Sequence, residues 1–247
     1  MKTTHNTMLI TGGTSGLGLG LAERFHAAGN TVIIAGRRAD LLEEIVAAHP
    51  GMESVLLDVS DPESIAAVYT SVTAAHPDLD VLINMAGIML PENLLDGSAL
   101  TVAEDTITTN ILGPIRMLNA FVPFLAAQDD AVIMNVSSGL AFVPLPFTPT
   151  YNATKAAIHS YTQSLRVQLA DTSVQVVELV PPAVRTALMG QTDDERAMPL
   201  DDFLDEVMAL IANDPDADEI LVERVKFLRF AEAEGRFDDV LELLSSH

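Results

Sequence analysis

Short apolar, β-branched runs recur along the chain, and stretches with helical spacing separate them. The apolar positions in these runs are nearly continuous and do not alternate with polar ones, which is typical of parallel strands covered on both faces. This pattern predicts seven strands, at Met8–Thr11, Thr31–Ala35, Ser54–Leu57, Val81–Asn84, Ala131–Val136, Val174–Val180 and Glu219–Val222.

The stretches between the strands predict helices at Gly18–Ala28, Asp40–Ala48, from Asp61 onward, Thr106–Ala127, Thr150–Ala170 and Phe237–Leu244. Asp61 precedes a proline, which fits an N-cap followed by the first helical position. Pro114 and Pro123 fall inside the fourth helix, so we expect it to bend. The polar stretch Thr186–Leu200 is expected to form a mobile loop near the substrate.

Alternating strands and helices predict an α/β fold, a doubly wound parallel sheet of about seven strands flanked by helices. The chain has 247 residues, 49% of them apolar and 19% charged, so it can build a large core. No linker or repeat interrupts the pattern, and we expect residues 1–247 to form one Rossmann-type domain, ending in a strand and tail helix over 219–247.

Composition excludes several kinds of site. The chain has no cysteine, which rules out disulfides, thiolate nucleophiles and zinc sites that contain cysteine. Its six histidines show no metal-ligand spacing, so no metal is expected. The apolar run near the start is too short for a signal peptide, and no run of about 18 apolar residues occurs. A cytoplasmic protein is expected.

The net charge is −22, which disfavours nucleic acid and anionic membranes as partners. Lysine occurs at only three positions, Lys2, Lys155 and Lys226. An ordinary acidic bacterial protein and a salt-adapted one are both compatible with this balance.

Glycines at 12, 16 and 18 stand where the first strand turns into a helix. Glycine allows so tight a turn and a close approach of the backbone to a pyrophosphate, and the helix start offers free N–H groups. A plain structural turn is the alternative. Leu21 stands where a GxGxxG pattern would need its third glycine, so the spacing is GxxxGxG. The segment TGGTSGLG resembles the nucleotide-binding signature of the short-chain dehydrogenase/reductase superfamily.

The residues after the second strand bear on the choice of dinucleotide. NAD-specific Rossmann proteins carry an acidic residue here, whereas this chain has Arg37 and Arg38 after Gly36. Guanidinium groups bind a 2′-phosphate well, so NADP(H) is favoured, with NAD(H) possible. Arg37 is the stronger candidate, Thr14 or Ser15 could assist, and Arg38 could equally be a solvated residue at the helix start.

The resemblance implies further cofactor contacts. Asp58 would hold the adenine, and Asn84-Met85-Ala86-Gly87 resembles the family's NNAG segment with Met85 in place of an asparagine. Pro182 replaces the usual glycine after the sixth strand, a feature similar to a branch named after the teichoic-acid D-alanylation operon. The implied cofactor contacts are Gly12, Thr14, Ser15, Gly16, Leu17, Gly18, Arg37, Arg38, Asp58, Val59, Asn84, Ala86, Gly87, Tyr151, Lys155, Pro181, Val184 and Thr186.

Tyr151 and Lys155 form a YxxxK motif, whose spacing places both side chains on one helix face. A nearby ammonium lowers the pKa of a phenol, which makes tyrosine a usable acid or base. Alone, the motif occurs by chance on many helices. Ser138, thirteen residues earlier, matches the spacing of the family and would hold the substrate oxygen. The resemblance also implies that Lys155 binds the nicotinamide ribose and that Asn110 positions a water that links Lys155 to solvent.

Substrate contacts are less distinct. Apolar residues in the segment 140–150, with Leu188 and Met189, could line an apolar pocket or simply pack the loop. The candidate contacts are Ser138, Leu140, Phe142, Phe147, Tyr151, Leu188 and Met189.

These features predict an NADP(H)-dependent oxidoreductase that reduces a ketone or aldehyde to an alcohol, or the reverse. An NAD(P)-dependent alcohol dehydrogenase or an epimerase is an alternative. A dinucleotide-sensing regulator without turnover is another, and it would be expected to have lost one of Asn110, Ser138, Tyr151 and Lys155, all of which are present. The resemblance also implies a homodimer or homotetramer, with which two long apolar helices agree loosely.

Overall fold

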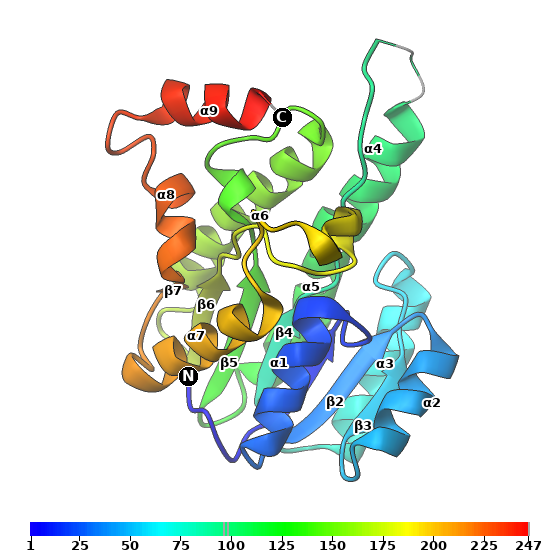
Figure 1. Ribbon diagram of the computed structural model, residues 1–247. Helices are drawn as coiled ribbons and strands as arrows, with labels where there is room; N and C mark the ends of the chain where they lie inside the picture. Colours follow the sequence, from blue (N-terminus) through cyan, green and yellow to red (C-terminus); the bar gives the residue numbers. More distant parts are fainter. Residues whose placement is uncertain (96, 98, 247) are drawn as a thin grey trace.

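The computed structural model describes residues 1–95, 97 and 99–246 and contains a sheet of seven parallel strands. Its order is β3-β2-β1-β4-β5-β6-β7, which confirms the predicted doubly wound fold (Figure 1). The strands are β1 (Thr7–Thr11), β2 (Thr31–Gly36), β3 (Glu53–Leu56), β4 (Val81–Asn84), β5 (Ala131–Val136), β6 (Val174–Leu179) and β7 (Glu219–Ile220). All seven agree with the prediction to within two residues at each end.

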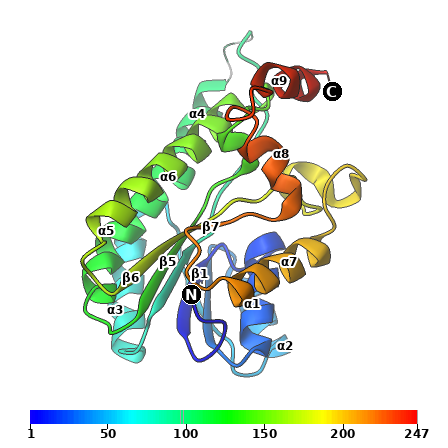
Figure 2. The same ribbon diagram turned by 90° about the vertical axis from the view of Figure 1, so that its left-hand side faces the viewer.

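Helices cover both faces of the sheet, because neighbouring strand residues point to opposite sides. On one side lie α1 (Gly16–Ala27), α2 (Ala39–Ala48) and α7 (Leu200–Asn213), whose apolar residues pack with Met8 and Ile10 of β1. On the other side lie α3 (Pro62–Ala75), α5 (Gly113–Leu125) and α6 (Pro149–Gln168), whose apolar residues pack with Leu9 of β1. Figure 2 shows the two helical layers with the sheet between them.

The C-terminal segment lies beyond the carboxyl ends of the strands and not on a face of the sheet (Figure 2). It contains the 3₁₀ turn η4 (Glu223–Val225), α8 (Lys226–Arg229) and α9 (Phe237–Ser245). Val240 of α9 forms a small separate core with Val143 and Ala231. The tail helix was predicted at 237–244. Among the described residues, no helix has both the length and the apolar character needed to cross a bilayer.

Helix α7 was not predicted. Its residues Phe203, Leu204, Val207 and Ile211 recur at helical spacing and are all buried. The sequence predicted a loop over Thr186–Leu200 but no element in the residues between that loop and the last strand. The segment 186–200 contains the short 3₁₀ segment η3 (Leu188–Asp193), and its Met198 forms a parallel bridge with Val184, which precedes the segment.

The predicted long helix Thr106–Ala127 is divided. The helix α4 (Ala99–Ile107) leads into a π-helical turn, η1 (Thr108–Leu112), and then into α5. The Gly113 N–H bonds to the carbonyl of Thr108, five residues back. Pro114 has no N–H for the carbonyl of Asn110 four residues back, which disfavours a regular α-helix here. Pro123 lies inside α5.

Phe203→Ala should show how far the fold depends on α7. Phe203 is fully buried against the α1 side of the sheet, so its truncation should lower the free energy of unfolding by about 3–5 kcal/mol, measured in urea. Val167→Ala is the matched control, since that side chain is 77% exposed and should cost about 0.5 kcal/mol or less. Equal effects of the two changes would contradict the packing of α7.

Candidate functional site

A cleft of about 890 Å³ lies at the carboxyl ends of the strands. The chain leaves β1 toward one face of the sheet and β4 toward the other, so the crossover helices diverge and open a crevice there. The cleft is lined by residues from the ends of five strands, from the segment 186–197 and from the C-terminal segment. Most of the predicted site residues meet in it.

The glycine loop forms the floor at one end. Gly12 has φ +71°, and a Cβ there would lie 2.9 Å from Ala86 Cα. A Cβ on Gly18 would lie 2.3 Å from the carbonyl oxygen of Gly12. No other residue fits such contacts without moving the backbone. The loop therefore presents bare backbone and the start of α1 to the cleft, as a pyrophosphate requires.

The two arginines after β2 both line the cleft, and Arg38 is the one tied to the glycine loop. Its Nη2 donates to Thr14 Oγ1 at 2.7 Å and to Ser15 Oγ at 2.9 Å. The sequence favoured Arg37, whose charge instead acts on Asp58. Burial opposes ionisation of Asp58, but bonds from the Ser60 N–H and hydroxyl, with Arg37, hold its pKa below the usual range.

Ser138 and Tyr151 meet beside the opposite end of the cleft. Ser138 follows β5 and caps a 3₁₀ turn, η2 (Gly139–Ala141), where its Oγ accepts a bond from the Leu140 N–H at 3.1 Å. Tyr151 lies in the first turn of α6 and is buried. Burial raises the pKa of Tyr151 to about 12, and a hydrogen bond with Ser138 opposes that rise. The net shift of the Tyr151 pKa is therefore upward, whereas the sequence predicted a lowering by Lys155.

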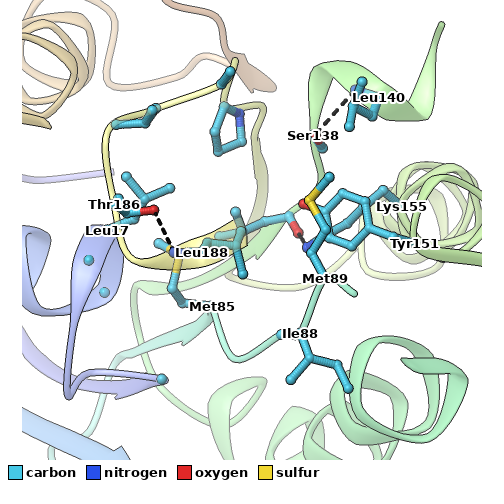
Figure 3. A pocket seen from close by; sticks show the side chains of 18 of the residues that line it. Leu17, Met85, Ile88, Met89, Ser138, Leu140, Tyr151, Lys155, Thr186 and Leu188 are labelled. Atoms are coloured by element: carbon cyan, nitrogen blue, oxygen red, sulfur yellow. Dashed lines mark hydrogen bonds between the residues drawn. The ribbon is translucent and has the colours of Figure 1, made fainter. Parts of the chain in front are cut away.

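Lys155 lies one turn beyond Tyr151 on the same face of α6, and Figure 3 shows the two side by side. Its Nζ lies 5.6 Å from the centre of the Tyr151 ring and donates to the carbonyl oxygen of Val136 at 2.7 Å. Burial lowers the pKa of Lys155 to about 8, and the charge of Glu178 opposes that change. The ammonium form still predominates at neutral pH.

Asn110 lies on the π-helical turn and is buried beneath the cleft, without lining it. Its Oδ1 accepts from the Ile88 N–H at 2.8 Å, and its Nδ2 donates to the Ile88 carbonyl at 2.8 Å and to Thr154 Oγ1 at 3.2 Å. A Cβ built on Gly87 would lie 3.3 Å from Asn110 Oδ1 and 3.9 Å from Lys155 Nζ. Asn110 and Lys155 therefore converge on Gly87.

Comparison with known proteins agrees with this arrangement. The family model described as short chain dehydrogenase matches residues 6–197. The chain belongs to the short-chain dehydrogenase family. It is 43% identical over 199 residues to a Bacillus subtilis protein named uncharacterized oxidoreductase DltE, covering 80% of this chain and 79% of that one. This relative supports the predicted branch, and the family makes the chain an oxidoreductase.

Solved structures of other proteins share the fold. A short chain dehydrogenase from Burkholderia cenocepacia, solved in complex with NADP, is 25% identical, with TM-score 0.86 and full coverage of both chains. A 3-ketoacyl-(acyl-carrier-protein) reductase from Brucella melitensis, complexed with NADH, is 26% identical, with TM-score 0.78 over 87% of this chain and 93% of that one.

The structure places most, but not all, of the predicted site residues of this short-chain dehydrogenase in the cleft. Those that line it are Gly12, Thr14, Ser15, Gly16, Leu17, Gly18, Arg37, Arg38, Asp58, Val59, Ala86, Gly87, Ser138, Leu140, Phe147, Tyr151, Lys155, Pro181, Val184, Thr186 and Leu188.

Four predicted residues do not line the cleft: Asn84, Asn110, Phe142 and Met189. The Asn84 amide donates to Asn135 inside the sheet, so Asn84 joins two strands. The Phe142 ring packs against His159 and under the Arg229 guanidinium, away from the cleft. Met189 is exposed on η3, where it has φ +55°.

The C-terminal segment supplies residues that the sequence did not single out. Phe227 and Leu228 of α8 and Leu243 and Leu244 of α9 line the cleft, and so do Leu145 and Met89. The apolar stripe of α9 was visible in the sequence, but its partner was not. Only the folded chain shows that this stripe forms a wall of the cleft.

Asn110→Ala should destabilise the protein even without a cofactor. The change removes both partners of the Ile88 peptide groups, so the free energy of unfolding in urea should fall by about 2–4 kcal/mol. Asn213→Ala, at the exposed end of α7, is the control and should change it by about 0.5 kcal/mol or less. A loss no larger than the control's would contradict the structural part played by Asn110.

Proposed function

We propose that this protein is an NADP(H)-dependent reductase that converts an aldehyde or ketone to an alcohol by hydride transfer. The observation that carries the proposal is the meeting of Ser138, Tyr151 and Lys155 at one end of a cleft whose other end holds a glycine loop and two arginines. This arrangement joins a dinucleotide cradle to a proton donor.

The residues present fit a nicotinamide dinucleotide, which supplies hydride when bound. The bare backbone of the glycine loop and the start of α1 would hold the pyrophosphate, and Asp58 and Val59 would border the adenine. Arg38 already lies over Thr14 and Ser15, and Arg37 lines the same end. Two guanidinium groups suit a 2′-phosphate, which supports NADP(H) over NAD(H). The Burkholderia cenocepacia relative was solved with NADP.

The proton donor is Tyr151. With a pKa near 12 its phenol is neutral at physiological pH, the form that donates a proton. The carbonyl oxygen of the substrate would accept hydrogen bonds from the Ser138 and Tyr151 hydroxyls. The proton passes from Tyr151 to that oxygen as charge develops on it. Lys155 stabilises the phenolate that remains. Asn110 helps to position the water that links Lys155 to solvent, through which Tyr151 regains its proton.

The substrate proposed is an apolar aldehyde or ketone. Leu140, Leu145 and Phe147 form one side of the cleft near Ser138, and the C-terminal residues Phe227 and Leu243 form another. Such walls exclude water from the reacting centre and bind a substrate by its apolar area.

Tyr151→Phe tests the chemistry. The variant keeps the ring but loses the acid, so kcat for aldehyde reduction should fall by about 10³-fold, while the Kd for NADPH changes by less than about threefold. The matched control is Tyr161→Phe on the exposed side of the same helix, which should retain activity. Near-normal turnover in Tyr151→Phe would overturn the assignment.

Arg38→Ala tests the cofactor. Loss of a charge-assisted contact to the 2′-phosphate should lower kcat/KM for NADPH about 10- to 100-fold and leave the value for NADH nearly unchanged. Arg166→Ala, near the end of α6 and outside the cleft, should alter neither. A wild-type protein that uses NADH with the higher kcat/KM would contradict the preference.

A further inference from the structure

Glu178 is a fully buried carboxylate that the proposed reaction does not use. It lies on β6, in register with Asn135 of β5 and Glu219 of β7. A carboxylate with no access to water is costly unless opposite charges or hydrogen-bond donors surround it. Its surroundings are therefore informative.

Helix α6 places a line of side chains over Glu178. Tyr151, Lys155 and His159 stand at i, i+4 and i+8, so they share one face of the helix. His159 Nδ1 lies 3.0 and 2.8 Å from the two carboxylate oxygens of Glu178. Lys155 lies one helical turn from His159, and its Nζ bonds the carbonyl of Val136, the residue that follows the β5 partner of Glu178. The charge of Glu178 acts on this ammonium group. Glu178 thus contacts His159, and Lys155 is the next side chain along the same face of that helix.

The far side of this group is closed by an ion pair. Arg229 of α8 binds the Glu219 carboxylate at 3.0 Å and stacks on the Phe142 ring, while Glu219 lies 4.0 Å from His159. The ligand atoms of His159, Glu178 and Glu219 lie within 4.8 Å of one another, as in a metal site. Arg229 already supplies a cation to Glu219, and the Gln163 amide contacts His159 Nε2. The arrangement is therefore a buried charge network.

Lys155 needs such a neighbour. Its ammonium is buried and donates to a peptide carbonyl, which is a neutral acceptor. Without an anion nearby, burial alone would favour the uncharged amine. An uncharged Lys155 could not stabilise the Tyr151 phenolate formed during reduction.

We propose that Glu178 is a positioning residue that keeps Lys155 charged inside the active site, with His159 holding the carboxylate in place. The importance of Lys155 for turnover rests on the proposed function. The charge interaction between Glu178 and Lys155 does not depend on that function. The groups that face this interaction are Tyr151 and His159 of α6, Glu219 of β7 and, through Glu219, Arg229 of α8.

The charge interaction can be measured without any turnover. The chain has only three lysines, so protein with ¹³C-labelled lysine gives three ε-carbon signals by NMR, and Lys155→Arg assigns the one from the active site. Lys2 and Lys226, with exposed side chains, serve as internal references. In Glu178→Gln the pKa of Lys155 should fall by about one unit or more, because an opposite charge close by has been removed.

Two variants are controls for this titration. Glu219→Gln removes the neighbouring carboxylate, which is held by Arg229, and should leave the Lys155 titration within about 0.3 units of wild type. Glu178→Asp retains the charge and should restore most of the wild-type value. An unchanged Lys155 titration in Glu178→Gln would overturn the proposal.

Turnover gives the second readout. Removing a negative charge makes loss of a proton from the Tyr151–Lys155 pair easier, whichever group gives it up. The alkaline limb of kcat for reduction should therefore move to lower pH in Glu178→Gln, with kcat nearly normal at the acidic end. A role in folding alone predicts a uniform loss at all pH values and an unmoved limb, and that result would contradict the proposal. If wild type reduces no carbonyl compound, the proposed function fails while the NMR result still decides the charge interaction.

Discussion

The buried ammonium group of Lys155 constrains much of the site around it. A charge in that position requires acceptors and opposite charge from the protein, and each comes from a different element. The Val136 carbonyl at the end of β5 accepts its hydrogen bond, and Glu178 on β6 supplies the compensating charge. Helix α6 fixes the lysine one turn from Tyr151, and Gly87 leaves the space in which Lys155 and Asn110 converge.

The distribution of charged side chains along the chain also bears on cofactor binding. A chain with net charge −22 would repel an anionic dinucleotide unless cations were gathered where it binds. Five of the thirteen lysine and arginine side chains line the cleft: Arg37, Arg38, Lys155, Arg196 and Arg224. The cleft thus gathers positive charge on a molecule that is acidic as a whole. Because the chain has only three lysines, the buried Lys155 stands out among them.

The sequence was sufficient where the signal is local. Continuous apolar runs predicted the strands, and a glycine loop followed by YxxxK and Ser138 predicted the family, because turn geometry and helix spacing depend on near neighbours. Arg38 was ranked below Arg37, since the order of two adjacent side chains around a turn depends on backbone direction. Glu178 was not singled out in the sequence, because its contacts come from α6 and β7.

Other features depended on contacts across the fold. The π-helical turn at Asn110 follows from Pro114 only once the helix is known to pack so that Asn110 reaches Ile88. Helix α7 was not predicted, and Leu243 belongs to the cleft only because α9 folds back over the strand ends. Phe142 shows the opposite case: an apolar residue beside the cleft whose ring faces the charge network instead.

The central step of the proposed function is the passage of hydride between a dinucleotide and a carbonyl carbon in this cleft. Transfer of label tests it directly: NADPH carrying deuterium at nicotinamide C4 is incubated with the protein and a series of apolar aldehydes, and the products are analysed by mass spectrometry and NMR. We expect one deuterium on the carbinol carbon of the alcohol, and we expect the Tyr151→Phe variant to form this labelled alcohol about 10³-fold more slowly. Absence of labelled alcohol from every aldehyde and ketone tried, with NADPH bound to the protein, would contradict the account.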